Sequence, residues 1–296
     1  MISSFKQVRK LLINRAPITV AVACAADEEI LKAVSIGVSE GYAKAILTGK
    51  RSEIEVMIKN TPLSESTIID CANDEEAVMA AVKEVKADRA DLLMKGLVNT
   101  SVFMRGVLNR ENGLREAPLL SMLGIFELPF YHKLLFITDS GINVAPSGDQ
   151  KAIILSNALD AMGNMGVKNP KVGVLTANEA VDPKVQSTVD AAYLVKEWEE
   201  GRWSNAIVEG PMAFDVMFNK KAAEHKGIES DISGDVDLML VPNIETGNAL
   251  AKSWLLFNNA QWAGLVLGAK KPILLGSRSD SAEVKALSLA VAALLI

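Results

Sequence analysis

The residues best suited to chemistry lie in one short segment around residue 277. A strand-like apolar run ends at Leu275, and Gly276-Ser277-Arg278-Ser279-Asp280-Ser281 then leads into a helical pattern that begins at Ala282. Free N–H groups at a helix start, Ser hydroxyls and the guanidinium fork of Arg bind a phosphate or another oxyanion. The same residues are also typical of a Ser N-cap with Glu283 in the first turn. From spacing alone, anion binding and simple helix capping are equally good interpretations.

Four further polar segments follow strand-like runs in the same way. They are residues 95–100, 139–147, 209–215 and 243–248. Each one alone is better explained as a turn or a helix cap, because Asp, Asn, Ser, Gly and Pro are the commonest turn residues. Their shared position is more informative, since the carboxyl ends of parallel strands meet at one edge of a sheet. The sequence therefore predicts one site assembled from several loops.

Alternating strands and helices are expected to position these loops. Apolar runs of strand length alternate with longer runs of helical period, which is the pattern of parallel βαβ units. Strands are expected at residues 18–24, 45–47, 67–70, 91–94, 118–123, 134–138, 171–175, 205–209, 238–241 and 272–275. After an amphipathic first helix, helices are expected at residues 28–40, 52–59, 74–85, 101–108, 151–162, 185–198, 247–256 and 282–294. The pattern predicts an α/β fold with parallel sheets, and a length of 296 residues favours two domains over one core.

Composition and charge limit the kinds of partner. Hydrophobic residues make up 49% of the chain and charged residues 23%, so a sizeable core is expected. The net charge is -5, and no run of Lys and Arg is long enough to follow a nucleic-acid backbone. We therefore expect no nucleic-acid partner, whereas a small phosphorylated ligand is compatible with local Arg and N–H groups.

Cysteines, histidines and apolar runs exclude further classes of protein. Cys24 and Cys71 form no CxxC pair, and buried structural thiols are the preferred interpretation. With only His132 and His225 in the chain, a Cys/His dyad or a His-rich metal site has few candidate members. No apolar run approaches the roughly 20 residues that a membrane span requires. The N-terminal residues also lack the pattern of a signal peptide, so we expect a cytoplasmic protein without a membrane partner.

Signatures of several enzyme classes are missing. The sequence has no GxGxxG after the first expected strand, no GxxxxGKS or GxxxxGKT, no HExxH and no nucleophile elbow. Nucleotide hydrolysis, zinc-dependent proteolysis and Ser hydrolase chemistry are therefore poorly supported.

Taken in order, the polar segments resemble those of the phosphate acetyl/butyryltransferase family over nearly the whole chain. The stretch Pro242-Asn-Ile-Glu-Thr-Gly-Asn is the most specific match. The forms Asp139-Ser-Gly-Ile-Asn-Val and Ser277-Arg-Ser-Asp-Ser look more like the butyryl branch of the family than the acetyl branch.

The resemblance implies a fold and a reaction. It implies two domains with parallel-sheet, three-layer αβα architecture, similar to the isocitrate and isopropylmalate dehydrogenases, with the active site in the interdomain cleft. Residues 1–138 with 270–296 would form the first domain, and residues 139–269 the second. The implied reaction is butyryl-CoA plus phosphate giving butyryl phosphate plus CoA, with no metal or cofactor. A homodimer or a larger homo-oligomer is also implied.

The resemblance also implies roles for individual residues. Ser277 would contact the CoA sulfur, and Arg278 the phosphate or the developing oxyanion. The acetyl branch uses an Asp a few positions later as the base, where this chain has Val284, so Asp280 is favoured over Glu283 for that role. The residues expected to bind phosphate or CoA are Lys95, Thr100, Arg115, Asn143, Glu209, Asn243, Thr246, Gly247 and Asn248. For Arg115, an ordinary surface position is an equally good interpretation.

Three alternatives stay open at this point. The first is a phosphate acetyltransferase that uses acetyl-CoA. The second is a metal- and NAD-dependent dehydrogenase of the isopropylmalate dehydrogenase-like fold, in which Asp231, Asp235 and Asp237 could form a carboxylate cluster, although solvated loop acids are the preferred interpretation. The third is a non-catalytic protein that binds CoA esters, which the departure at Val284 would explain.

Overall fold

The chain divides into two compact units. The structure, a computed structural model, describes residues 2–277 and 280–296. Unit 1 comprises Ser121–Gln261 with the first residues of the chain, and unit 2 comprises Phe5–Leu120 with Trp262–Ile296. The domain limits expected from the sequence, 1–138 with 270–296 and 139–269, differ from these units and stay a prediction.

Unit 2 is built on strands in the order β3-β2-β1-β4-β11-β10. Its strands are β1 (Ile18–Ala23), β2 (Ala43–Gly49), β3 (Thr67–Asp70), β4 (Leu92–Lys95), β10 (Gln261–Leu267) and β11 (Ile273–Leu274). Its helices are α1 (Phe5–Leu12), α2 (Glu28–Ser39), α3 (Arg51–Ile58), α4 (Asp74–Lys86), α5 (Thr100–Val107) and α11 (Ala282–Leu295). The pairs from β3 to β11 are parallel, and β10 runs antiparallel to β11.

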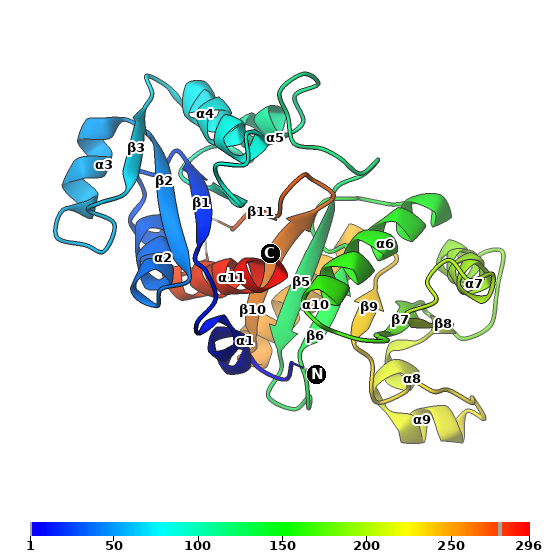
Figure 1. Cartoon of the computed structure of the whole chain (residues 1–296). Helices are drawn as coiled ribbons and strands as arrows, with labels where there is room; N and C mark the ends of the chain where they lie inside the picture. The colour runs from blue at the N-terminus through cyan, green and yellow to red at the C-terminus, as the bar shows by residue number, and fades with distance from the viewer. Residues whose placement is uncertain (1, 278–279) are drawn as a thin grey trace. The chain divides into compact units, whose positions relative to one another are not determined.

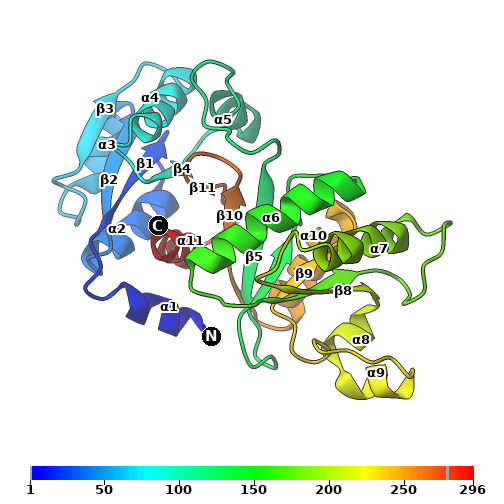
Figure 2. The same ribbon diagram turned by 45° about the vertical axis from the view of Figure 1, so that its right-hand side comes forward.

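The handedness of the crossovers distributes the helices of unit 2 over both faces. The chain moves outward from β1 to β2 and β3 and then crosses back to β4, and right-handed connections place α4 on the face opposite to α2 and α3. Figures 1 and 2 show α4 and α5 on one side of these strands and α2 and α11 on the other. The α11 helix packs against α1 and α2, and its residues from Lys285 to Leu294 are buried.

Unit 1 has strands in the order β5-β6-β9-β7-β8. Its strands are β5 (Ser121–Glu127), β6 (Leu135–Thr138), β7 (Lys171–Leu175), β8 (Ile207–Met212) and β9 (Leu238–Leu240). Its helices are α6 (Gly148–Asn164), α7 (Gln186–Glu199), α8 (Phe214–Phe218), α9 (Lys220–His225) and α10 (Ile244–Phe257). A hairpin makes β5 and β6 antiparallel, and the other pairs are parallel. The crossover rule places α6 and α7, which pack together, on the face opposite to α8 and α9.

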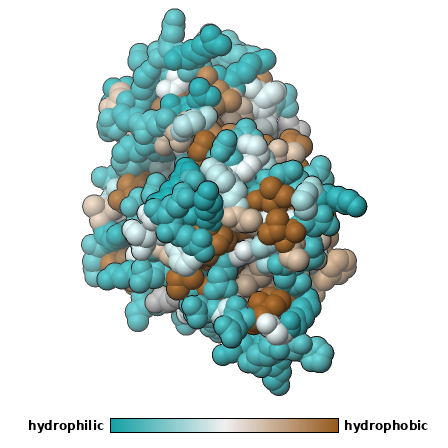
Figure 3. Space-filling model, turned by 90° about the vertical axis from the view of Figure 1, so that its right-hand side faces the viewer, coloured by the Kyte–Doolittle hydropathy of each residue, from teal (hydrophilic) through white to brown (hydrophobic). Residues whose placement is uncertain are grey.

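The elements confirm a mixed α/β fold and correct two expectations. The strand pairing is not purely parallel, because the β5–β6 and β10–β11 pairs are antiparallel. The elements β10, α8 and α9 were not predicted. Among the described residues, no helix is long and apolar enough to cross a membrane. Figure 3 shows a face on which hydrophobic residues form separate patches among hydrophilic ones.

Candidate active site

Neighbouring strands β1 and β4 of unit 2 create the geometry for a ligand site. Their crossover helices lie on opposite faces, which is the switch point where open α/β sheets bind ligands. After β4 the chain turns against the end of β1, with the Gly96 N–H donating to Ala23 O over 2.8 Å and the Leu97 N–H to Cys24 O over 2.9 Å. A Cβ on Gly96 would lie 2.2 Å from Cys24 O, so this close approach requires glycine.

A cavity of about 140 Å³ lies beside this turn and brings two predicted site residues together. Lys95, at the end of β4, and Ser277, after β11, both line it. The complete lining is Asp27, Glu29, Ile30, Lys95, Gly96, Leu97, Val98, Gly276, Ser277 and Lys285. Positions 182 residues apart in the chain therefore share one cavity, as the convergence of strand ends predicted.

The turn after β11 combines a helix cap with an acidic group. Ser281 Oγ accepts the Val284 N–H over 3.4 Å, so Ser281 caps α11. The half-buried Asp280 carboxylate accepts the Ser277 N–H over 2.7 Å. Burial raises the pKa of Asp280, while the Ser277 N–H and the Lys285 ammonium oppose the rise. The predicted Arg278 lies outside the described residues.

Glu283 is held away from this cavity by an ion pair. Its Oε1 accepts a hydrogen bond from Arg9 Nη2 over 2.6 Å, and Arg9 Nη1 also lies 3.4 Å from Glu40 Oε1. The Glu283 side chain is exposed and does not line the cavity. Asp280 is not part of the lining either, but its carboxylate binds the N–H of the lining residue Ser277, whereas Glu283 is paired with Arg9. This difference favours Asp280 over Glu283 as a group that acts on a ligand.

Lys285 is a cavity residue that sequence reasoning missed. It is 6% exposed, and its ammonium donates to the backbone carbonyl of Asp280. Both carboxylates in the lining are occupied by backbone N–H groups, because Asp27 accepts from Ile30 and Glu29 accepts from Ala282. A Lys one turn into an otherwise apolar helix was the signal that could have identified this residue.

Two predicted residues of unit 2 lie outside the cavity. Thr100 is the exposed first residue of α5, and Arg115 is exposed in the loop before β5. The Arg115 backbone forms an isolated bridge with Ala269. Neither side chain lines the cavities described in unit 2.

Unit 1 holds a larger cavity of about 830 Å³ at the carboxyl ends of β6, β7 and β9. It is lined by Ala145, Pro146, Ser147, Gly148, Gln150, Lys151, Leu175, Thr176, Ala177, Gln186, Ser187, Asp190, Phe214, Pro242, Asn243, Thr246 and Leu250. The predicted residues Asn243 and Thr246 are among them. Asn243 Oδ1 accepts from the Thr246 N–H over 2.9 Å and from Thr246 Oγ1 over 2.7 Å, which caps α10.

The loop from Asp139 to Ser147 is organised around a buried carboxylate. Asp139 is 2% exposed and accepts hydrogen bonds from the N–H groups of Gly141, Ile142 and Asn143. Asn143 Nδ2 also donates to it over 2.5 Å, so the predicted Asn143 supports the loop. A Cβ on Gly247 would lie 2.8 Å from Ser140 Cα, which explains the glycine at the start of α10.

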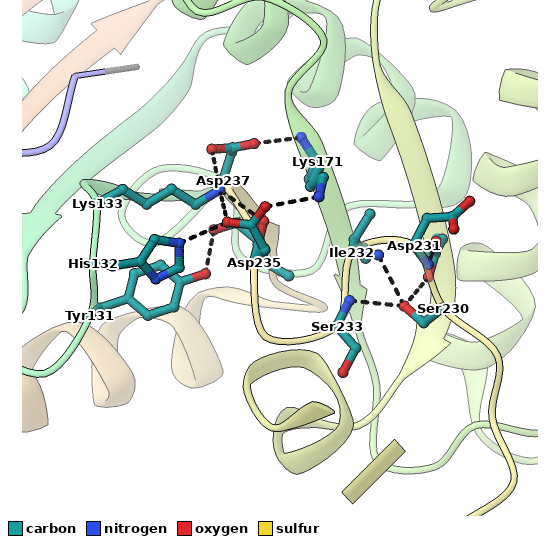
Figure 4. Close-up of polar contacts among 12 residues, drawn as sticks. Tyr131, His132, Lys133, Lys171, Ser230, Asp231, Ile232, Ser233, Asp235 and Asp237 are labelled. Carbon is teal, nitrogen blue, oxygen red and sulfur yellow. Dashed lines mark hydrogen bonds and ion pairs between the residues drawn. The ribbon is translucent and has the colours of Figure 1, made fainter. Parts of the chain in front are cut away.

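Glu209 and Asn248, the remaining predicted residues, do not line the larger cavity. The Glu209 carboxylate accepts from Ser230 Oγ over 2.5 Å and from the Asp231 N–H over 2.9 Å. Ser230 Oγ in turn accepts the Ser233 N–H over 2.9 Å (Figure 4). Glu209 therefore anchors the loop before β9, and Asn248 is exposed on α10.

The acidic residues before β9 form ion pairs with lysines. Asp235 accepts hydrogen bonds or ion pairs from His132, Lys133 and Lys171 at 2.7–2.8 Å, and Asp237 lies 2.7 Å from Lys133 Nζ (Figure 4). Asp237 is 2% exposed, so the interpretation of these acids as solvated is wrong for Asp237. Among the described residues, no group of three His, Cys, Asp or Glu side chains could hold a metal ion.

The chain is similar to known proteins over most of its length. Residues 72–293 match the family model described as phosphate acetyl/butaryl transferase. The phosphate butyryltransferase of Clostridium acetobutylicum is 38% identical, over 99% of this chain and 98% of its own. The probable phosphate butyryltransferase of Bacillus subtilis is 41% identical over 96% of each chain. A branched-chain phosphotransacylase structure from Enterococcus faecalis has a TM-score of 0.85 and 31% identity, covering 94% of this chain and 98% of that chain.

The dehydrogenase likeness is confined to the fold. A putative 4-hydroxythreonine-4-phosphate dehydrogenase structure from Salmonella typhimurium has a TM-score of 0.60 and 13% identity, covering 95% of this chain and all of that chain. Matching over three quarters of its length to one family model, and over nearly all of it to curated relatives, the chain belongs to the phosphate acetyl/butyryltransferase family.

Proposed function

We propose that the protein exchanges an acyl group between coenzyme A and inorganic phosphate, with butyryl-CoA and butyryl phosphate as the reacting pair. The observation that carries the proposal is the cavity at the start of α11, where Ser277 and two buried lysines, Lys95 and Lys285, converge. Its volume of about 140 Å³ suits a small anion. The lining also holds Asp27 and Glu29, but their carboxylates accept backbone N–H groups, so the ammonium groups can favour a phosphate there. Family membership supports the same reaction.

The reaction needs phosphate held beside the thioester, stabilisation of charge on the carbonyl oxygen and stabilisation of the leaving thiolate. We assign the thiolate to the Ser277 hydroxyl, and the phosphate or the oxyanion to Arg278, with Lys95 and Lys285 adding positive charge. In the reverse direction a base must remove the CoA thiol proton. We assign that role to Asp280, because Glu283 is committed to Arg9.

The choice of butyryl over acetyl rests on the sequence forms at Asp139 and Ser277 and on the names of the relatives in Clostridium and Bacillus. An acetyl-CoA-dependent enzyme is the second candidate, because one family model covers both reactions. Butyryl has two methylene groups more than acetyl, and in a hydrophobic pocket such a difference changes the binding free energy by only a few kcal/mol. The preference between the two substrates is therefore settled by measurement.

Several wider properties are proposed on the family resemblance. They are binding of the reactants in an interdomain cleft, a homodimeric or larger assembly, a cytoplasmic location and independence from metals and redox cofactors. For the assembly, exposed aromatic side chains give additional support, since Phe130 is 96% exposed and Phe257 is 83% exposed. The roles of Thr100, Arg115, Asn143, Glu209 and Asn248 in substrate binding likewise stay proposals.

The decisive experiment measures free thiol released from butyryl-CoA when phosphate is added, with acetyl-CoA in parallel. We expect release that depends on both substrates and is faster with butyryl-CoA. Faster release from acetyl-CoA would identify the acetyl enzyme. Binding of butyryl-CoA without thiol release would favour a non-catalytic binding protein, and tight binding of either Mn²⁺ or NAD would favour the dehydrogenase.

A further inference from the structure

The large cavity of unit 1 contains a buried ion pair that the chemistry above does not use. Lys151 Nζ, from α6, lies 2.5 Å from Asp190 Oδ2, from α7, and the two residues are 4% and 5% exposed. Lys151 Nζ also donates to Pro146 O over 2.9 Å, and Gln186 Nε2 donates to Asp190 Oδ1 over 2.9 Å. These contacts use two of the three ammonium protons, and two of the roughly four acceptor sites of the carboxylate.

The size of the cavity sets the scale of its ligand. Its volume of about 830 Å³ lies within the range of about 300–1,000 Å³ that is typical of small-molecule sites. The cavity beside Ser277 has a volume of only about 140 Å³. Phosphate suits the smaller one, whereas the larger one has room for an extended organic group.

The charge of the lining excludes the anionic end of coenzyme A. Lys151 and Asp190 are the only charged residues among the described residues that line the cavity, and they are paired directly with each other, so their charges cancel. Three phosphate groups would find no net positive charge there. The remaining walls combine apolar side chains, such as Leu175, Phe214 and Leu250, with neutral donors and acceptors.

The same lining argues against a short acyl chain as the occupant. A butyryl chain has no polar atom beyond its thioester, so it would leave the third Lys151 proton and the remaining acceptor sites of Asp190 without partners. The pantetheine arm of CoA matches better, because it is uncharged and carries two amides, a hydroxyl and a dimethyl-substituted carbon. Amide carbonyls can accept from an ammonium, and amide N–H groups can donate to a carboxylate.

We propose that this cavity binds the pantetheine arm of the acyl-CoA. Lys151 donates its third proton to an amide carbonyl of the arm, and Asp190, held by Gln186, accepts an amide N–H. Leu175, Phe214 and Leu250 contact the dimethyl carbon and the methylene groups. The proposal rests on the proposed function for its substrate, and it assigns recognition of that substrate to residues remote in sequence from Ser277.

A double substitution and a matched control can test the pair. Removing one member alone would leave a buried charge unpaired, whereas replacing both with apolar residues of similar volume is often tolerated. We therefore choose Lys151→Met with Asp190→Leu. The control is Lys133→Met with Asp237→Leu, a pair that is also buried in unit 1 but lies at the amino ends of β6 and β9, at the opposite edge of the sheet (Figure 4).

The measurement compares kcat/KM, at saturating phosphate, for three butyryl thioesters: those of CoA, of pantetheine and of 2-mercaptoethanol, which carries no amide. For the Lys151/Asp190 variant we expect kcat/KM to fall at least tenfold, and by the same factor, with butyryl-CoA and butyryl-pantetheine. With the 2-mercaptoethanol thioester we expect kcat/KM to change less than twofold. The control variant should keep the wild-type ratio between the three thioesters. Folding of both variants is checked by circular dichroism.

Two kinetic outcomes would overturn the proposal. An equal loss with all three thioesters would mean that the pair supports the fold or the chemical step. A loss with butyryl-CoA alone would mean that the cavity binds the nucleotide end. If the wild-type protein releases no thiol from any thioester, the proposed function fails, and calorimetric titration with pantetheine then tests the binding proposal by itself. Binding of pantetheine by the wild type and not by the variant supports the proposal. Absence of binding by the wild type refutes it.

Discussion

The Ser277 N–H donates a hydrogen bond to the Asp280 carboxylate over 2.7 Å. This bond joins the residue assigned to the CoA sulfur and the residue assigned to its proton within one turn. Burial raises the pKa of Asp280 above the ordinary value for aspartate. A carboxylate with a raised pKa accepts a proton more readily near neutral pH, which suits a base.

Asp280→Asn should lower exchange in both directions, since the two directions share one transition state. For CoA attack on butyryl phosphate, the base must be ionised, so activity increases as the pH rises through the pKa of Asp280. We expect the variant to lose at least tenfold in kcat and to lose this acidic limb. Glu283→Gln is the control, because its partner is Arg9, and it should retain the limb. A limb that disappears in Glu283→Gln instead would transfer the role to Glu283.

Lys285→Met should move the acidic limb to higher pH. The Lys285 ammonium holds the pKa of Asp280 down against the effect of burial, so removing this positive charge raises that pKa further. Full ionisation of Asp280 then requires a more alkaline solution. Lys285→Arg, which keeps the charge, should leave the limb closer to its wild-type position, and the exposed Lys83→Met on α4 should not move it. The pH profile of initial rates measures the shift.

Arg278→Ala should lower turnover by at least about 100-fold, because a positioned charged donor aimed at developing charge typically contributes that much. Arg278→Lys should recover little of the loss, since an ammonium does not reproduce the planar guanidinium fork. Near-wild-type turnover in a folded Arg278→Ala protein would contradict the assignment.

The sequence predicted much of the fold because local patterns suffice for regular elements. The strands expected at 67–70 and 171–175 coincide with β3 and β7. The β10 strand was missed because only three residues separate it from α10, and a short apolar run does not distinguish strand from helix. Its antiparallel pairing with β11 depends on tertiary structure.

The candidate site was less predictable, because its pairing is tertiary. Lys95 and Ser277 were found from their positions after strands. Lys285 lies within an apolar helix, and Lys151 and Asp190 are 39 residues apart on two helices. No short-range pattern indicates that two such side chains meet. Conversely, polar residues such as Glu209 looked functional but bind their own neighbouring loop.

Asp235→Asn should make the free energy of unfolding less dependent on pH in the acidic range. Burial opposes ionisation of Asp235, but hydrogen bonds from Lys133, Lys171 and His132 outweigh it and hold the pKa of Asp235 below its ordinary value. A lowered folded-state pKa gives stability that is complete above the unfolded pKa of about 3.9 and is lost as the pH falls through the folded pKa. Because the Asp235 side chain is 42% exposed and solvent screens its ion pairs, we expect the variant's free energy of unfolding at pH 7 to be lower by about 1 kcal/mol. Urea unfolding at pH 7 and pH 3 should show this difference shrinking at the lower pH; a constant difference would contradict it.

Gly247→Ala should destabilise unit 1 by about 1–3 kcal/mol, the usual cost of overpacking. Its Cβ would lie 2.8 Å from the backbone of Ser140, in the loop that Asp139 organises. Gly163, in α6, is the matched control, since a Cβ there meets nothing within 4 Å. Gly163→Ala should stabilise the protein by about 0.5–1 kcal/mol, because alanine favours a helix more than glycine does. Thermal unfolding of both variants should show shifts of opposite sign.

The discontinuity of unit 2 affects how the chain can fold while it is being synthesised. Ser121–Gln261 leaves the ribosome as one continuous stretch, whereas Phe5–Leu120 emerges without β11, which pairs with β4, and without α11, which covers α1 and α2. At about 5–20 residues per second, the intervening segment takes on the order of ten seconds to translate. Throughout that interval α11 is not available to pack against α1 and α2, so unit 2 can complete its packing only after unit 1 has been synthesised.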